Sequence, residues 1–248
     1  MSLKIGIVSA MDREVAPLIS GWQRDILKHE EWVFATWRLG DVTYIQSGIG
    51  REPGLMATRA LVAAQRPDIL LTAGFAGALT RFHTVGETIT PGTVIDVHSG
   101  ERFALPCGNG VLASAQSIAD ESAKKDLAER FGADVVDMEG ASVVSVAQEN
   151  GIPVCAVKTI SDELGFAMPP FSPYVREDGT LAIERFAAHV AVRPGYWPSL
   201  IQLARNSKAA SLELSSSLEN LLRYMSPDGG SADLRDAVRQ LESARPVH

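Results

Sequence analysis

The sequence predicts an α/β fold: one domain with three layers, α/β/α, around a mixed and partly barrel-like central sheet. Its 248 residues, 46% hydrophobic and 21% charged, suffice for one large core. Buried β-branched runs alternate with helical patterns along most of the chain. We expect the domain to span residues 1–225, and residues 226–248, which begin Ser-Pro-Asp-Gly-Gly, to form a loose tail with one short helix.

Residues 133–163 form the most informative stretch, because they read as strand, helix and strand. Val135 and Val136 lead into a helical pattern, Gly151 ends it, and residues 152–160 form a second buried run. A crossover of this kind predicts that the two strands are parallel neighbours.

Carboxylates follow both of these strands. Asp137 and Glu139 come directly after the first strand, and Asp162 comes at the end of the second. Since α/β sheets bind ligands at the carboxyl ends of their strands, we expect these side chains to form half of an active site.

A further carboxylate, Glu14, follows the first predicted strand, residues 3–8. The pattern after that strand predicts a helix with Val15, Leu18 and Ile19 on one face, which places Glu14 in its first turn. Taken alone, Glu14 is more simply explained as a surface carboxylate at a helix start.

The remaining elements are predicted by periodicity and by turn residues. The helix at residues 119–131 reads as charged and exposed. Strands are expected at residues 32–39 and 42–46, paired as a hairpin, and at residues 69–72, 85–87, 93–97 and 111–115; the other helices are expected at residues 53–65, 182–191 and 199–224.

Two glycine turns and one proline-rich loop could contact a ligand. Ser47-Gly48-Ile49-Gly50 exposes backbone amides that can hold an anion or hydroxyls. Residues 73–79 contain two glycines that permit close approach of a ligand, although a plain tight turn explains them equally well. Residues 165–171 suit an apolar lid, or an ordinary surface connector.

Composition excludes several functions. A net charge of −7 and a pI near 5.3 argue against a nucleic-acid binder. Cys107 and Cys155 give no evidence for disulfides or zinc, so a reducing, cytoplasmic compartment is expected. No apolar run approaches the ~20 residues of a membrane span, and we expect a soluble protein. No histidine has metal-ligand spacing, and no Gly-x-Ser-x-Gly motif supports a serine hydrolase.

Four carboxylates therefore remain as candidates for chemistry, and each follows an apolar strand: Glu14, Asp137, Glu139 and Asp162. Any one of them alone is more simply structural. Several at the strand ends of one sheet favour acid–base chemistry with a cationic transition state.

The motifs resemble those of the purine nucleoside phosphorylase and nucleosidase superfamily, and most closely those of methylthioadenosine/S-adenosylhomocysteine nucleosidases. The similarity covers about residues 3–190 and implies a nucleoside phosphorylase-like fold. The motifs occur in the family's order: Ser-Ala-Met-Asp-Arg-Glu-Val from Ser9, Ser-Gly-Ile-Gly from Ser47, Ala-Gly-Phe-Ala-Gly-Ala-Leu from Ala73, Val-Asp-Met-Glu-Gly-Ala-Ser from Val136 and Ile-Ser-Asp-Glu from Ile160.

The resemblance implies a role for each matching residue. Asp162 matches the general acid that protonates the leaving purine, and Ser161 would orient it. Glu139 matches the carboxylate that binds the ribose hydroxyls and stabilises the oxocarbenium-like sugar, while Met138 packs on the ribose. Glu14 matches the glutamate that activates water. The division is chemically sensible, because one carboxyl must carry a proton while the others stay anionic.

The resemblance also implies a reaction that needs no metal or organic cofactor, and it indicates which residues line the substrate. Backbone groups of Phe75, Ala76 and Gly77, and of the loop from Ser47 to Gly50, would line the sugar and nucleophile side.

Three departures from the family pattern bear on the reaction. Phe75 stands where relatives carry Ser or Thr, and Thr72 stands where phosphorylases carry an arginine, which favours hydrolysis over phosphorolysis. Residues 98–117 are shorter than the family's base- and sugar-binding insertion, and Ser114-Ala115-Gln116 replaces its Ser-Gly-Asp motif. A shortened wall suits a bulky or lipophilic 5′ substituent. In this respect the sequence also resembles the hopanoid-associated phosphorylase-like branch.

We therefore expect an N-ribosyl hydrolase that acts on a purine-type nucleoside. The alternatives are a phosphate-dependent nucleoside phosphorylase and a non-catalytic nucleoside-binding module. Relatives form oligomers, so a homo-oligomer, most simply a dimer, is expected to bury residues 33–37 and 166–171 at its interface.

Overall fold

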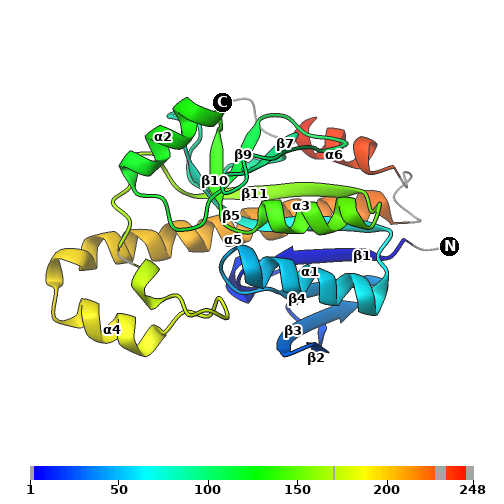
Figure 1. The fold of residues 1–248 in the computed structure, drawn as a ribbon, viewed down its shortest axis with the longest axis horizontal. Coiled ribbons are helices and arrows are strands. Elements are labelled where there is room, and N and C mark those ends of the chain that lie inside the picture. Colours follow the sequence, from blue (N-terminus) through cyan, green and yellow to red (C-terminus); the bar gives the residue numbers. More distant parts are fainter. Residues whose placement is uncertain (1–2, 170, 227–232, 244–248) are drawn as a thin grey trace.

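The structure is a computed structural model, which describes residues 3–169, 171–226 and 233–243. Within these ranges a mixed eleven-stranded sheet forms the centre of the molecule (Figure 1). The strands are β1 (Ile5–Ser9), β2 (Gln23–His29), β3 (Trp32–Leu39), β4 (Val42–Gln46), β5 (Ile69–Ala78), β6 (Thr88–Ile89), β7 (Thr93–Asp96), β8 (Arg102–Ala104), β9 (Val111–Ser114), β10 (Val135–Asp137) and β11 (Val154–Asp162).

Helices cover both faces of the sheet. In Figure 1, α1 and α3 lie in front of it and α5 lies behind it. The α-helices are α1 (Arg51–Gln65), α2 (Glu121–Phe131), α3 (Gly140–Glu149), α4 (Ile183–Ala191), α5 (Trp197–Met225) and α6 (Leu234–Ser243), and three short 3₁₀ helices span Asp12–Glu14, Ser172–Tyr174 and Pro194–Tyr196.

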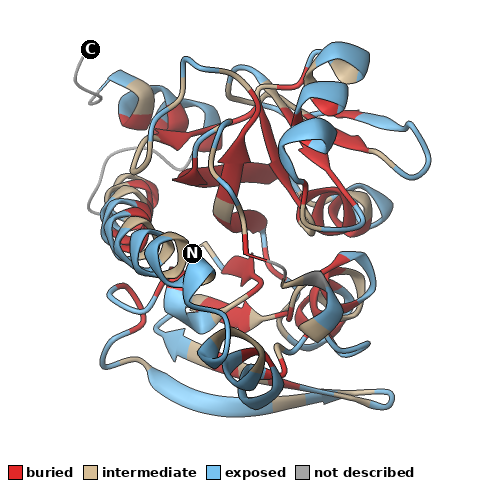
Figure 2. Ribbon diagram, turned by 90° about the vertical axis from the view of Figure 1, so that its left-hand side faces the viewer, coloured by how far each residue is buried: buried red, intermediate tan, exposed pale blue. Residues whose placement is uncertain are grey.

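The hydrophobic core follows these layers. Leu61 of α1 and Val144 of α3 pack on one side of the sheet, and Leu214 and Leu218 of α5 pack on the other. Figure 2 shows that buried residues concentrate in the sheet and on the inner sides of the helices. The predicted three-layer arrangement with a mixed sheet is confirmed.

Strand β5 is the centre of the sheet. It pairs in parallel with β1 and with β11, and its last residues pair in antiparallel fashion with β10. The prediction that β10 and β11 are parallel neighbours is therefore wrong, because β5 lies between them. Gly77 of β5 pairs with Val136 of β10 and with Asp162 of β11, so the ends of both strands still meet there.

Two other predictions fail near the site. Residues after β1 form only a 3₁₀ turn at Asp12–Glu14 instead of an α-helix, although Val15, Leu18 and Ile19 are buried as expected. Residues 73–78 continue β5 rather than forming a turn, because β11 pairs with them as far as Gly77.

Differences away from the site concern β2, β6, β8 and α6. The strand expected at residues 85–87 is wrong, because these residues form a turn before β6, and β8 was not predicted. Sequence reasoning did not predict β2, which pairs along its whole length with β3 of the predicted hairpin. Helix α6 falls in the expected loose tail, yet it packs on α5 with Leu234, Ala237, Val238 and Leu241 buried. Residues 227–232 and 244–248 of that tail lie outside the described residues. The single-domain organisation stays a prediction.

Candidate active site

A cavity of about 180 Å³ lies where β1, β5, β10 and β11 end. Glu14, Glu139 and Asp162 all line it. The sequence places these three carboxylates 125 and 23 residues apart (139 minus 14, and 162 minus 139), and the fold brings them around one space. Their chemical roles stay predictions.

Glu14 is held by the backbone of two strand ends. Its Oε1 accepts a hydrogen bond from the Phe75 N–H at 3.0 Å, and its Oε2 accepts one from the Met11 N–H at 3.0 Å. Gly74 has φ +147, and a Cβ there would lie 3.3 Å from both carboxylate oxygens, so glycine leaves room for Glu14. Burial raises the pKa of Glu14, although the two N–H donors lower it. A carboxylate of increased basicity suits the removal of a proton from water.

Glu139 lies between α3 and the loop that precedes α1. Its Oε1 accepts a hydrogen bond from the Gly50 N–H at 2.6 Å. Burial and, after it, the negative charge of Asp137 raise the pKa of Glu139 to about 8, against the lowering effect of the Gly50 bond. Glu139 therefore holds a proton near neutral pH, and a cationic sugar beside it would favour the anion.

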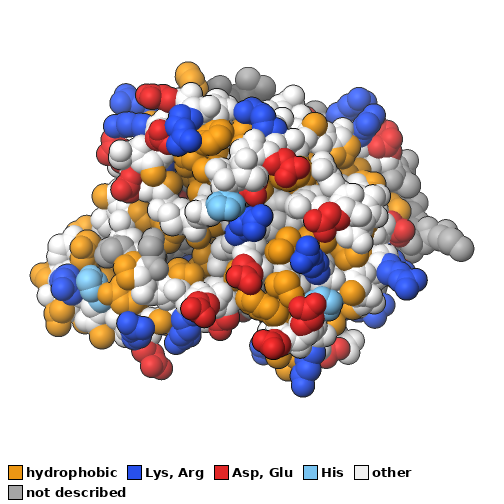
Figure 3. All heavy atoms as spheres, in the orientation of Figure 1, with side chains coloured by type: hydrophobic (Ala, Val, Ile, Leu, Met, Phe, Trp, Pro, Cys, Tyr) orange, Lys and Arg blue, Asp and Glu red, His pale blue; other side chains and the backbone are white. Residues whose placement is uncertain are grey.

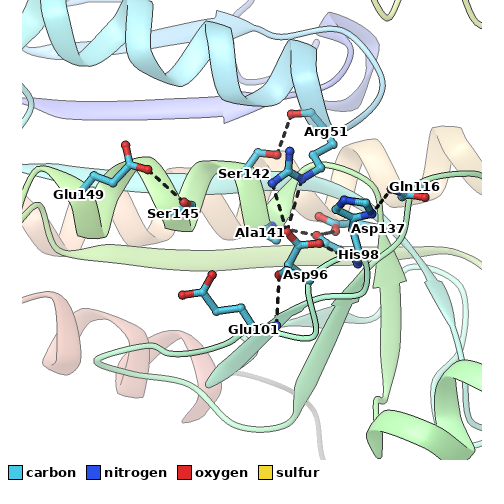
Figure 4. Close-up of polar contacts among 12 residues, drawn as sticks. Arg51, Asp96, His98, Glu101, Gln116, Asp137, Ala141, Ser142, Ser145 and Glu149 are labelled. Carbon is cyan, nitrogen blue, oxygen red and sulfur yellow. Dashed lines mark hydrogen bonds and ion pairs between the residues drawn. The ribbon is translucent and has the colours of Figure 1, made fainter.

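Asp137 also lines the cavity, but its oxygens are bound by groups of the protein. It accepts hydrogen bonds from Ser114 Oγ and from the Gly140 N–H, the latter at 2.9 Å, at the start of α3. Lys158 Nζ lies 2.8 Å from Asp137 Oδ2, and both side chains are buried. Figure 4 shows Asp137 near the start of α3, close to Ala141. Asp137 thus fixes the turn that carries Glu139.

Asp162 is paired with a lysine that the sequence analysis did not single out. Its Oδ1 accepts a hydrogen bond from Ser161 Oγ at 2.7 Å, and its Oδ2 accepts one from Lys124 Nζ at 2.5 Å. Lys124 Nζ also donates to the Glu163 backbone carbonyl at 3.0 Å. Lys124 and Asp162 both line the cavity.

Two buried lysines were thus missed, Lys124 and Lys158. Lys158 interrupts an apolar strand, and a charge in such a run signals a buried partner. Lys124 lies three residues before buried Leu127, so it shares the inner face of α2. The expectation that this helix is exposed is wrong on that face.

Six of the nine predicted substrate-binding residues line the cavity. They are Ile49, Phe75, Ala76, Gly77, Met138 and Ser161. Gly50 instead holds Glu139 through its N–H.

Ser47 and Gly48 are not brought to the cavity. The Ser47 hydroxyl bonds to the backbone carbonyls of Ser9 and Gly48, at 3.2 and 2.8 Å. Gly48 lies against residues 178 and 179, with the Asp178 carbonyl 2.7 Å from where its Cβ would be. Contacts within the protein therefore occupy this part of the loop.

Several apolar side chains also line the cavity. Met168 and Phe171 come from the predicted lid, and Leu181 and Leu203 come from later segments. Phe171 stacks on Phe186 of α4 with ring centroids 4.4 Å apart, which ties the lid to that helix.

The shortened segment, residues 98–117, reaches the cavity at Ser117. Ile118 and Ala119, which follow the segment, also line the cavity. Gln116, which stands in the altered motif, bonds to His98 Nδ1 at 2.6 Å (Figure 4). Arg51 at the start of α1 lies 3.4 Å from Asp96.

Metal and membrane features are absent from the described part of the chain. Residues 3–169, 171–226 and 233–243 contain no cluster of three or more His, Cys, Asp or Glu side chains suited to a metal ion. Among the same residues, no helix has the length and apolar character needed to cross a membrane.

A family model described as the phosphorylase superfamily matches residues 4–109 and 97–193. The chain belongs to the phosphorylase superfamily. The family resemblance predicted from the motifs is thereby confirmed.

The proteins that this chain resembles include nucleosidases. The 5′-methylthioadenosine/S-adenosylhomocysteine nucleosidase of Shewanella oneidensis is 24% identical over 216 residues, which cover 71% of this chain and 92% of the relative. The structure of an Arabidopsis thaliana 5′-methylthioadenosine nucleosidase matches with a TM-score of 0.69 and 17% identity, over 94% of this chain and 99% of that one. Futalosine hydrolase of Helicobacter pylori matches with a TM-score of 0.62 and 21% identity, over 88% and 98% of the two chains. These structures share the fold of this phosphorylase-superfamily chain.

Proposed function

We propose that the protein hydrolyses the N-glycosidic bond of a purine-type nucleoside. The observation that carries this proposal is the placement of Glu14, Glu139 and Asp162 around one cavity. The nucleosidases among the relatives bear out the enzyme class expected from the sequence, an N-ribosyl hydrolase.

Each carboxyl group has surroundings that fit one part of this reaction. Asp162 is the proposed acid at the base, because it lines the cavity and is held there by Ser161 and Lys124. Glu139 is proposed to contact the ribose and to stabilise its positive charge as the bond breaks. Glu14, whose pKa is raised by burial, is proposed to take the proton from the attacking water.

The substrate we propose has an apolar 5′ substituent. Met168, Phe171, Leu181 and Leu203 give the cavity a wall that would exclude water from such a group. The names of the relatives suggest three candidates, 5′-methylthioadenosine, S-adenosylhomocysteine and futalosine.

Phosphorolysis is the second candidate, and one observation favours it. The Arg13 side chain lines the cavity next to Glu14 and could pair with a phosphate. Thr72, at the position of the phosphorylase arginine, instead lies 3.2 Å from Lys158 and is buried. The phosphorylase arginine is thus absent from its position, so we favour hydrolysis.

The test is to incubate the protein with these three nucleosides, adenosine and inosine, with and without phosphate, and to measure free base. Hydrolysis predicts base release without phosphate and formation of the free sugar. Base release that requires phosphate and yields ribose 1-phosphate would establish the phosphorylase instead. Asp162→Asn, which removes the proposed acid, should release base much more slowly. Asp126→Asn changes an exposed carboxylate of α2 and is its control.

We also propose a homodimer. Val33 of the predicted interface is 63% exposed, whereas Phe34 beside it is buried in the core. Hydrophobic side chains also gather over α4 at the left of Figure 3, and Ile183, Val192 and Trp197 are exposed there. A second copy that covers this region would lie near Phe171. Light scattering at micromolar concentration would test the proposal, and a mass of 26.6 kDa with full activity would contradict it.

A cytoplasmic location is part of the same proposal. Its support is that both cysteines, Cys107 and Cys155, are free thiols, as expected in a reducing compartment. Cell fractionation with an antibody against the protein would test it.

A further inference from the structure

We propose that Lys124 supplies the proton that the leaving base receives, so that Lys124 and Asp162 together form the acid of this site. The inference rests on the N-glycosidic cleavage proposed above. It adds a lysine to the reaction, at the position where the motifs alone indicate a carboxyl group.

The first observation is the burial of Lys124. Only 2% of its side chain is exposed, although the next residue, Lys125, is 58% exposed on the same helix. Lysine is almost never fully buried unless it is paired. Its Nζ donates to Asp162 Oδ2 and to the Glu163 carbonyl, and it lines the cavity beside Asp162.

The second observation is that neighbouring elements make room for this pair. A Cβ on Gly77 would lie 2.8 Å from Asp162 Oδ2 and 3.2 Å from Lys124 Nζ, so glycine vacates the space that the pair occupies. The Asp120 side chain caps α2 through the Ala123 N–H at 2.9 Å, and Leu127 is buried one turn further on. These contacts hold Lys124 toward the cavity.

The third observation is the pattern of hydrogen bonds on Asp162. Both carboxyl oxygens accept bonds, one from the Ser161 hydroxyl and one from the Lys124 ammonium. Lys124 Nζ carries only donors, so its contact with Oδ2 places a Lys124 proton against the Asp162 carboxyl group. In the proposed mechanism the acidic proton at this end of the cavity comes from Lys124.

The reaction then balances without any other reactant. The bond between C1′ and the base nitrogen breaks, and its electron pair stays on the base. The Lys124 ammonium gives one proton, through Asp162, to a base nitrogen and becomes a neutral amine. Water attacks C1′ and its proton goes to Glu14. After release of base and sugar, solvent carries that proton away and returns one to Lys124.

A purely structural lysine would only neutralise Asp162, and an arginine could do that equally well. The guanidinium keeps the positive charge and the hydrogen bonds but does not give up its proton in proteins. The comparison of Lys124→Arg with Lys124→Met therefore separates proton supply from charge pairing. Lys125→Met is the matched control, because Lys125 is exposed and pairs only with Glu121 in the part of the chain that the structure describes.

The assay measures base release from the best nucleoside of the panel, and phenolate release from 4-nitrophenyl β-D-ribofuranoside. The phenolate leaves without needing a proton. We expect Lys124→Arg and Lys124→Met each to lose about 10²- to 10⁴-fold on the nucleoside. Both should lose much less on the nitrophenyl riboside than on the nucleoside, and Lys125→Met should keep both rates.

Two results would overturn the inference. One is a Lys124→Arg enzyme within threefold of wild type on the nucleoside, since Lys124 would then act only as a counter-charge. The other is an equal loss on both substrates in both variants, because the loss would then come from disturbed structure. If wild-type protein cleaves no nucleoside at all, the proposed function itself fails.

Discussion

Gly77→Ala should disturb the site by adding a single methyl group. The backbone of Gly77 does not lie in the left-handed region, so alanine can adopt it. The added Cβ would lie 2.8 Å from Asp162 Oδ2, whereas ordinary contact begins at 3.4 Å. The carboxyl must therefore move by about 0.6 Å (3.4 minus 2.8 Å), and Ser161 and Lys124 resist that movement because they hold its two oxygens.

The size of the effect follows from this displacement. A misplacement of about 1 Å can cost roughly 10²-fold in rate, so about 0.6 Å should cost on the order of 10- to 20-fold in kcat. Overpacking of a well-packed interior also destabilises a protein by about 1–3 kcal/mol, which urea unfolding would measure.

The assay compares kcat for base release with the free energy of unfolding, in Gly77→Ala and in Gly195→Ala. Gly195 is the matched control, because a Cβ there meets no heavy atom within 4 Å. We expect Gly195→Ala to leave both quantities unchanged. Wild-type kcat in Gly77→Ala would refute the reasoning, since it would mean that the Asp162–Lys124 pair can move without consequence.

Three further predictions concern the carboxyl groups. Asp162→Asn should lower kcat by about 10²- to 10⁴-fold, as measured by base release, and undiminished turnover would remove Asp162 from the mechanism. Burial raises the pKa of Glu139 to about 8, and its anion is the form proposed to act. We therefore expect kcat/KM to rise as the pH increases through about 8. Glu139→Gln should lose this rise together with most activity. The folded protein holds the Glu139 proton more tightly than the unfolded chain, so its contribution to stability is complete below the ordinary pKa of 4.5 and is lost as the pH rises through about 8. Urea unfolding at pH 5 and pH 9 should show the loss in wild type and a smaller loss in Glu139→Gln.

The sequence alone predicted the parts of the fold that short-range patterns specify. The hairpin of β3 and β4 is found at the predicted residues, because strand alternation and the Gly40-Asp41 turn are local signals. Helix α1 begins two residues before the prediction, at Arg51. The positions of Glu14, Glu139 and Asp162 after apolar strands were also readable, and the family motifs gave each a proposed role.

Strand pairing could not be derived in this way. The crossover from β10 to β11 suggested neighbours, but β5 separates them, because its ten residues are long enough to pair with β11 along most of their length and with β10 at the end. The partner of a strand is set by contacts between residues far apart in the chain, which local periodicity does not contain.

Burial of charge was decided by the tertiary structure as well. Lys124 and Lys125 are adjacent and chemically identical, and both belong to a helix with a charged pattern. Lys125 forms an exposed pair four residues away, whereas Lys124 reaches Asp162, 38 residues along the chain. The sequence determined which proton-carrying groups the protein has and which strand ends carry them. Only the packing of α2 against the end of β11 decided which of them share one buried cavity, because the environment of a charge depends on what the rest of the fold places beside it.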